Sequence, residues 1–131
     1  MQREKELSLA QILIAESEDE LLLLFRTYLS SLGKSTEAAN SGHEALDYFQ
    51  QSKEKQRPYD AILLDTHLSD PSGLDVAKRI RSENPDQKIV LVTTTPKKYL
   101  SEECLRTAAI KEKDILTMPF KLANLAMVLR N

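Results

Sequence analysis

Acidic and hydroxyl side chains stand directly after several short apolar segments of the sequence. Glu16 and Ser17 follow the segment QILIA, Asp65 follows AILL, and Thr93 follows IVLV. Two carboxylates held close together repel each other unless a cation or a shared proton relieves the repulsion. Carboxylate oxygens with room for water suit Mg²⁺. With a hydroxyl nearby to donate to an oxyanion, such residues describe a place where a carboxylate accepts a phosphoryl group.

The segments that would position these residues alternate with stretches of helical periodicity. The third and fourth segments are nearly continuous apolar runs, which is typical of strands buried on both faces of a parallel sheet. The alternation predicts an α/β domain of three layers, a five-stranded parallel sheet with helices on both faces and right-handed crossovers. The expected strands are Gln11–Ala15, Ser35–Ala39, Ala61–Leu64, Ile89–Val92 and Ile115–Thr117.

In an open parallel sheet, the functional crevice lies beyond the carboxyl ends of the strands, where the strand order reverses. A strand order of 2-1-3-4-5 would place the first and third strands next to each other at that reversal. Glu16 and Asp65 would then lie side by side.

Serine residues mark the expected helix starts. Ser17 and Ser41 each begin an S-x-x-E sequence, which predicts a capping box, and Ser72 begins a weaker version. We therefore interpret Ser17 as a helix cap rather than as a ligand. The fourth helix begins either at Pro96 or after Ser101, because both positions carry a start signal.

Composition excludes several classes of protein. The 131 residues include 18 Lys and Arg and 20 Asp and Glu, giving a net charge of −2, whereas nucleic-acid-binding modules carry a basic face. Cys104 is the only cysteine, so a disulfide framework or a cysteine-ligated zinc site is excluded within the chain. His43 and His67 are expected to be exposed. Because no apolar run reaches transmembrane length, we expect a cytoplasmic protein without direct nucleic-acid or membrane contact.

From roughly Ser8 to the C-terminus, the chain resembles the response-regulator receiver domain. The most specific element is Asp65 at a strand end, followed eight residues later by Gly73. The SG-x-EAL segment at Ser41–Leu46 and the Pro-Phe pair that begins at Pro119 add support. We expect a single receiver domain over residues 9–131, preceded by a flexible N-terminal arm over residues 1–8.

The resemblance implies a flavodoxin-like fold with strand order 2-1-3-4-5 and a role in a two-component phosphorelay. Asp65 would be the phosphoacceptor and Thr93 the switch hydroxyl. Glu16, Asp65 and the backbone carbonyl of His67 would bind Mg²⁺. The partners would be a histidine kinase or phosphotransfer protein, and a downstream protein or attached output domain. A homodimer is also open, and the last two helices with the fifth strand would carry the signal.

Three positions depart from the receiver pattern. Ser17 stands where an acidic metal ligand is usual, so we expect weak Mg²⁺ binding. Met118 replaces the lysine that pairs with the phosphoryl oxygens, and the thioether of methionine cannot pair with an anion. Lys121, three residues on, is expected to point elsewhere, and Ile115 takes the place of an aromatic switch residue. The family geometry also implies a cis Met118–Pro119 bond.

Three hypotheses follow for function. The first is a receiver that accepts a phosphoryl group on Asp65 and is not itself an enzyme. The alternative is a degenerate receiver that acts as a phosphorylation-independent interaction or dimerisation module, motivated by Ser17, Met118 and Ile115. The third is a small aspartyl phosphatase, which has little support because His67 stands where a general acid would be needed. The residues leave the cognate kinase and the output open.

Overall fold

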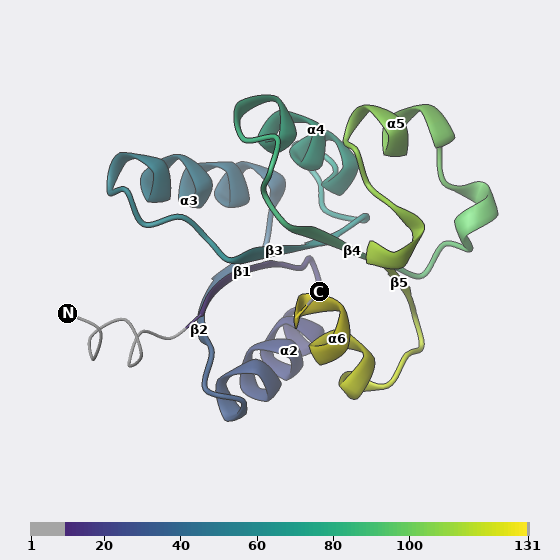
Figure 1. Ribbon diagram of the computed structural model, residues 1–131. Coiled ribbons are helices and arrows are strands. Elements are labelled where there is room, and N and C mark those ends of the chain that lie inside the picture. Colours follow the sequence, from purple (N-terminus) through teal and green to yellow (C-terminus); the bar gives the residue numbers. More distant parts are fainter. Residues whose placement is uncertain (1–9, 131) are drawn as a thin grey trace.

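The computed structural model describes residues 10–130, and within them five strands form one parallel sheet (Figure 1). The sheet order is β2-β1-β3-β4-β5, which confirms the predicted order. The expected arm, residues 1–8, lies outside the described residues, and the domain bounds of 9–131 stay a prediction. The strands are β1 (Gln11–Ala15), β2 (Ser35–Ala39), β3 (Ala61–Asp65), β4 (Ile89–Thr93) and β5 (Ile115–Thr117).

Two strands extend one residue further than their apolar runs. β3 includes Asp65, which pairs in register with Val92, and β4 includes Thr93, which pairs with Thr117. Strand pairing joins backbone groups, so it continues past the last apolar side chain of each run. The carboxylate and the hydroxyl of interest are therefore carried by the sheet itself and not by loops.

Helices cover both faces of the sheet, as predicted. Figure 1 shows α3 (Gly42–Glu54), α4 (Gly73–Glu83) and α5 (Glu102–Thr107) on one face. On the other face lie α2 (Asp19–Ser31) and α6 (Leu122–Arg130). Two short 3₁₀ helices, η1 (Lys97–Tyr99) and η2 (Glu112–Asp114), connect elements near β4 and β5.

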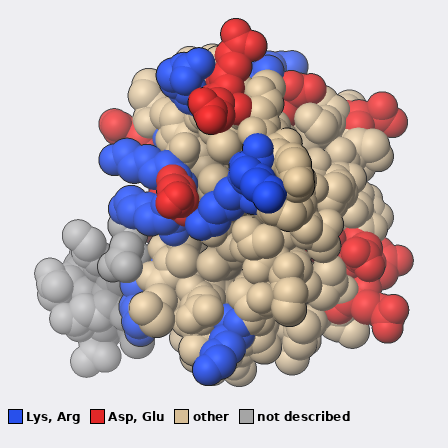
Figure 2. Space-filling model, turned by 90° about the vertical axis from the view of Figure 1, so that its right-hand side faces the viewer, with Lys and Arg blue, Asp and Glu red and all other residues tan. Residues whose placement is uncertain are grey.

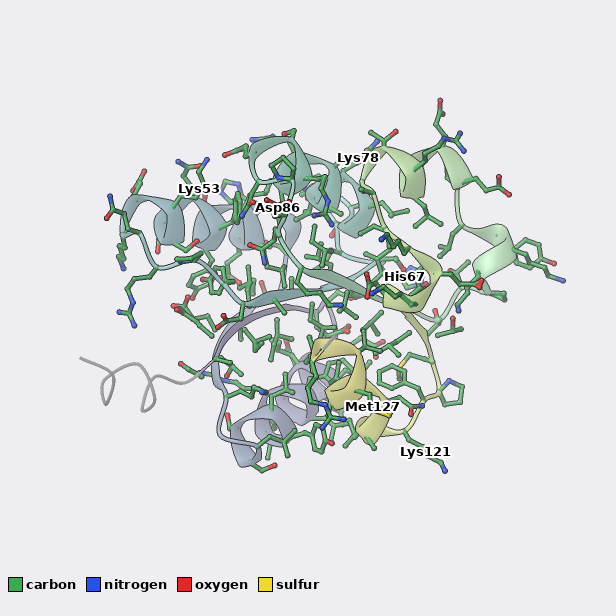
Figure 3. The ribbon with its side chains drawn as sticks, viewed as in Figure 1. Lys53, His67, Lys78, Asp86, Lys121 and Met127 are labelled. Atoms are coloured by element: carbon green, nitrogen blue, oxygen red, sulfur yellow. The ribbon has the colours of Figure 1, made fainter. Side chains whose placement is uncertain are left out.

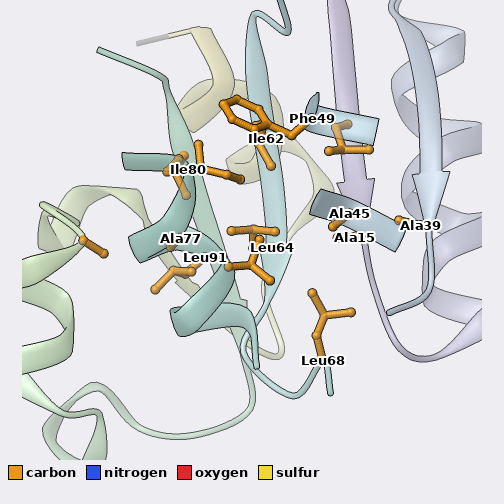
Figure 4. Close-up of a cluster of buried hydrophobic side chains, with 14 of the residues drawn as sticks. Ala15, Ala39, Ala45, Phe49, Ile62, Leu64, Leu68, Ala77, Ile80 and Leu91 are labelled. Carbon is orange, nitrogen blue, oxygen red and sulfur yellow. The ribbon is translucent and has the colours of Figure 1, made fainter. Parts of the chain in front are cut away.

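Each strand sends alternate side chains into two separate apolar layers. In the layer shown in Figure 4, strand residues Ile62, Leu64 and Leu91 meet residues of α3 and α4. In the opposite layer, Phe25 of α2 stacks on Phe120 with ring centroids 6.1 Å apart. Burial on both faces explains why β3 and β4 read as unbroken apolar runs.

Three of the four expected serine caps are present. The hydroxyls of Ser41, Ser72 and Ser101 accept hydrogen bonds from backbone amides at the starts of α3, α4 and α5. Of the two starts expected for the fourth helix, the structure has the one after Ser101, which caps α5, whereas Pro96 precedes only the separate 3₁₀ helix η1.

The prediction that Ser17 caps a helix is wrong. Helix α2 begins at Asp19, and its cap residue, Glu18, makes no side-chain capping bond. The Ser17 hydroxyl instead donates to Asp65 Oδ2 at 2.6 Å. The S-x-x-E pattern is local, whereas Ser17 follows β1 at the sheet edge where the end of β3 also lies. A charged acceptor across the sheet competes there with the backbone amides of the helix.

The Met118–Pro119 peptide bond is cis, as expected, and so is Asp70–Pro71. Among the helices of residues 10–130, none combines the length and the apolar character needed to cross a membrane.

Candidate functional site

The carboxyl ends of β1 and β3 bring Glu16 and Asp65 together, as the strand order predicted. Ala15 pairs in register with Leu64. Glu16 and Asp65, which follow these two residues in the chain, therefore lie at the same edge of the sheet. Both carboxyls are almost buried, with exposed fractions of 3% for Glu16 and 5% for Asp65. Burial of two acids side by side is costly unless hydrogen bonds or protonation offset it.

Hydrogen bonds to Asp65 come from both neighbouring segments. Its Oδ2 atom accepts from the Ser17 hydroxyl at 2.6 Å and from the Ser17 amide at 3.1 Å. Its Oδ1 atom accepts from the His67 amide at 2.8 Å. Hydrogen bonds to an ionised acceptor are the strong kind, so this arrangement favours a charged Asp65.

The two acids titrate in opposite directions. Burial, the hydrogen bond to Asp65 and the charges of Asp65 and Glu18 raise the pKa of Glu16 to about 8, although the Glu18 amide opposes the shift. Burial also acts to raise the pKa of Asp65, but hydrogen bonds from Ser17, His67 and Glu16 outweigh it and hold that pKa below its ordinary value. At neutral pH the metal-free pair therefore keeps one proton on Glu16 and a charge on Asp65.

The turn after β3 explains the spacing between Asp65 and Gly73. A Cβ atom on Gly73 would lie 2.1 Å from the carbonyl oxygen of Asp65, which is closer than such atoms approach. Helix α4 therefore starts directly against the strand end, and only glycine leaves room for it. Leu68 is buried in the same turn and its amide donates to the Asp65 carbonyl at 3.2 Å.

A group of threonine hydroxyls lies at the end of β4. Thr93 is buried, and its Oγ1 accepts from the Thr66 hydroxyl at 2.7 Å and from the Thr95 amide at 3.0 Å. Both hydrogen bonds are received by Thr93, so its own hydroxyl proton stays available for donation. The Thr94 hydroxyl lies 2.9 Å from His67 Nε2 instead. The structure thus separates the roles of consecutive threonines that the sequence leaves equivalent.

One residue of this site, Thr66, was missed from the sequence, and the side-chain contact of His67 was not foreseen. Thr66 directly follows Asp65, and that position was a signal that could have found it. His67 is exposed as expected, but its amide binds Asp65 and its ring contacts Thr94. The other histidine, His43, pairs with Asp47 at 3.3 Å on the surface of α3.

The side chains at the positions that depart from the receiver pattern carry no positive charge that could pair with an anionic ligand. Met118 packs against the apolar layer beneath α2 and α6, and Ile115 is buried in the opposite layer. Figure 3 shows Lys121 directed away from His67 and from the sheet edge. Within residues 10–130, no Lys or Arg forms an ion pair with Glu16 or Asp65.

The donor set suits a hard divalent cation only sparsely. The described residues contain no group of three or more His, Cys, Asp and Glu side chains that could hold a metal. Two carboxylates and a backbone carbonyl, from Glu16, Asp65 and His67, fit Mg²⁺, which keeps several of its waters and needs few protein ligands. Ser17 adds no charge to this donor set.

The comparison with known families shows which family this fold belongs to. The model of the response regulator receiver domain matches residues 12–130. The chain belongs to this family. It is 29% identical over 115 residues to the transcriptional regulatory protein RprY of Bacteroides fragilis, covering 88% of this chain and 45% of RprY. It is 30% identical over 119 residues to the probable transcriptional regulatory protein TcrX of Mycobacterium tuberculosis, covering 91% of this chain and 47% of TcrX. The chain thus spans less than half the length of these two relatives.

Solved receiver structures agree with the fold. The response regulator TrrA of Thermotoga maritima, in complex with Mg²⁺ and BeF, is 27% identical with a TM-score of 0.76, covering 93% of this chain and 97% of that one. A receiver domain from Methylobacillus flagellatus is 30% identical with a TM-score of 0.74, covering 94% and 98%. The chemotaxis protein CheY4 of Vibrio cholerae has a TM-score of 0.79 at 21% identity, covering 94% and 98%, which supports the fold alone. This receiver domain therefore has the flavodoxin-like architecture predicted for it.

Proposed function

We propose that this receiver domain accepts a phosphoryl group on Asp65 and signals through protein contacts. The observation that carries the proposal is the nearly buried Glu16–Asp65 pair at the sheet edge, with Asp65 held in its charged form. A charged carboxylate fixed by hydrogen bonds is a nucleophile in a defined position. Membership of the receiver family supports the same role.

Each residue then has a stated task. A lone pair of Asp65 forms a bond to phosphorus, and the bond from phosphorus to the donor's leaving group breaks and takes its electron pair with it. The Thr93 hydroxyl accepts two hydrogen bonds and keeps its own hydrogen for donation. It is therefore suited to donate to the phosphoryl oxygens as the switch residue. Glu16, Asp65 and the His67 carbonyl would hold Mg²⁺ weakly. When bound, the metal supplies positive charge that offsets the charge of the phosphoryl oxygens.

The partners we propose are a histidine kinase or phosphotransfer protein as donor and a downstream protein or attached output domain as receiver of the signal, with a homodimer as a further form. The surface on the side of α5 and β5 supports signalling by contact. Figure 2 views this side and shows a broad area without Lys, Arg, Asp or Glu beside a group of Lys and Arg side chains. Tyr99 of η1 and Met127 of α6 are exposed by 69% and 50%. We propose a cytoplasmic location, where such partners occur.

Intact-mass spectrometry tests the proposal directly. The domain is incubated with Mg²⁺ and acetyl phosphate, and Asp65→Asn serves as the control because it keeps the shape of the side chain but loses the nucleophile. We expect a phosphoryl adduct on the unchanged protein and none on the variant. Absence of an adduct on both would count against the proposal and in favour of the phosphorylation-independent interaction module.

A further inference from the structure

The Oδ2 atom of Asp65 is fully occupied by donors. An ionised carboxylate offers about four lone-pair positions. Three receive the Ser17 hydroxyl, the Ser17 amide and the His67 amide, at 2.6, 3.1 and 2.8 Å. Two of these three donors, both from Ser17, lie on Oδ2 and fill its two positions. Oδ2 can form a bond to phosphorus only after one of its two donors withdraws.

The three donors and the neighbouring Glu16 carboxyl differ in how easily they can withdraw. The two amides belong to the backbone beside β1 and β3 and cannot leave without moving the chain. Glu16 is 3% exposed, and the Glu18 amide holds its Oε2 atom at 3.1 Å. The Ser17 side chain is exposed, and rotation about a single bond removes its hydroxyl from Asp65. Of these groups, the Ser17 hydroxyl alone belongs to an exposed residue and can leave by rotation of its own side chain.

We propose that Ser17 is a positioning residue whose hydroxyl acts as a latch, which means that it covers Oδ2 of Asp65 until it turns away. This inference rests on the proposed function of Asp65. In the latched state the hydroxyl blocks Oδ2. When it turns away, a lone pair of Oδ2 forms the bond to phosphorus of acetyl phosphate. The bond from phosphorus to the acetate oxygen breaks, acetate leaves with that electron pair, and the Ser17 proton stays on Ser17. Opening the latch thus precedes the transfer and slows it.

Phosphorylation kinetics test the latch. The rate of adduct formation is measured by intact mass over a range of acetyl phosphate concentrations, at fixed Mg²⁺. In Ser17→Ala we expect the maximal rate to rise about tenfold, the lower end for removal of one hydrogen bond to a charged group. The half-saturating concentration of acetyl phosphate should not change, because the latch acts on Asp65 and not on donor binding.

Two further variants separate the latch from a general structural effect. Ser17→Thr restores a hydroxyl at this exposed position and is expected to bring back the slow rate. Ser30→Ala makes the same change as Ser17→Ala at another exposed position, on α2, and should leave both parameters as they are. Urea unfolding of each variant checks that it is folded.

The outcomes distinguish the two proposals. Equal or slower phosphorylation of Ser17→Ala, or a Ser17→Thr variant as fast as Ser17→Ala, would overturn the latch while phosphorylation of Asp65 stands. Absence of an adduct in the unchanged protein and in every variant would overturn the proposed function and the latch together.

Discussion

Without metal, the domain should lose stability as the pH rises from 5 to 8, because folding keeps a proton on Glu16. In the unfolded chain this carboxyl ionises near 4.5, whereas burial and its contact with Asp65 raise its pKa in the folded protein to about 8. Between these values the folded state binds one proton more than the unfolded state. The free energy of unfolding then falls by up to about 1.4 kcal/mol per pH unit. The stabilisation contributed by the protonated Glu16 carboxyl is fully present below pH 4.5 and is lost as the pH approaches 8.

The size of this effect is large relative to the stability of a domain. The interval from 4.5 to 8 is 3.5 pH units, so the upper bound of the loss is ~5 kcal/mol. Domains of this size have ~5–15 kcal/mol in total. Asp65 does not alter the pH range of this loss. Its pKa is lowered, so its own effect on the free energy of unfolding falls at more acidic pH.

Urea unfolding followed by circular dichroism at pH 5, 6, 7 and 8 in a chelating buffer measures the effect. The matched control is Glu16→Gln, whose amide keeps an oxygen for the Glu18 amide and offers a proton to Asp65. We expect the unchanged protein to lose stability across this range more steeply than the variant, and the variant to be more stable by several kcal/mol at pH 8. Parallel profiles for the two proteins would refute the assignment of the proton to Glu16.

Added Mg²⁺ provides a second check on the same reasoning. A metal held by the ionised pair in the folded state would compete with the proton. Millimolar Mg²⁺ should therefore flatten the profile of the unchanged protein at the alkaline end and leave that of Glu16→Gln nearly as it was. An equal response of both proteins to Mg²⁺ would show that the metal does not bind at Glu16.

Three further changes have definite expected outcomes. Gly73→Ala would place a Cβ atom 2.1 Å from the Asp65 carbonyl oxygen, so we expect a loss of ~2–3 kcal/mol in urea unfolding, and a loss under 0.5 kcal/mol would contradict this close approach. Met118→Lys restores the cation of the receiver pattern and should tighten beryllofluoride binding, measured by ¹⁹F NMR, about tenfold; unchanged affinity would place that side chain away from the anion. Thr93→Ala removes the buried hydroxyl of β4 and should weaken beryllofluoride binding more than Thr94→Ala does, whereas equal effects would mean that the switch hydroxyl is wrongly assigned.

Much of the fold was predictable because its signals are local in the sequence. The apolar runs of β3 and β4 are long enough to indicate buried strands by themselves, and the caps at Ser41, Ser72 and Ser101 act within a few residues. The weak segment β2, with the sequence STEAA, was recognisable only from its place between two helical stretches. Its strand pairs with β1 on one side only, so its residues need less apolar character than those of central strands.

Only part of the functional site could be predicted from the sequence. Residue type and strand ends were sufficient to select Glu16 and Asp65, since strand order converts positions far apart in the chain into neighbours. Thr93 was chosen among consecutive threonines only through the resemblance to the receiver domain. The role of Ser17 was wrongly inferred, because its local pattern is that of a helix cap. Its actual partner, Asp65, lies 48 residues away, and a hydrogen bond across the sheet leaves no trace in the spacing of nearby residues.

The sequence by itself determined the order of elements, the faces that they bury and the acids that meet at the sheet edge. These follow from hydrophobic periodicity and from the geometry common to parallel sheets. Only the tertiary structure decided which acid keeps the proton, which threonine is buried and which oxygen of Asp65 is covered. Those properties depend on distances of about 3 Å between groups from different strands, and such distances are fixed by packing of the whole domain and not by any one segment.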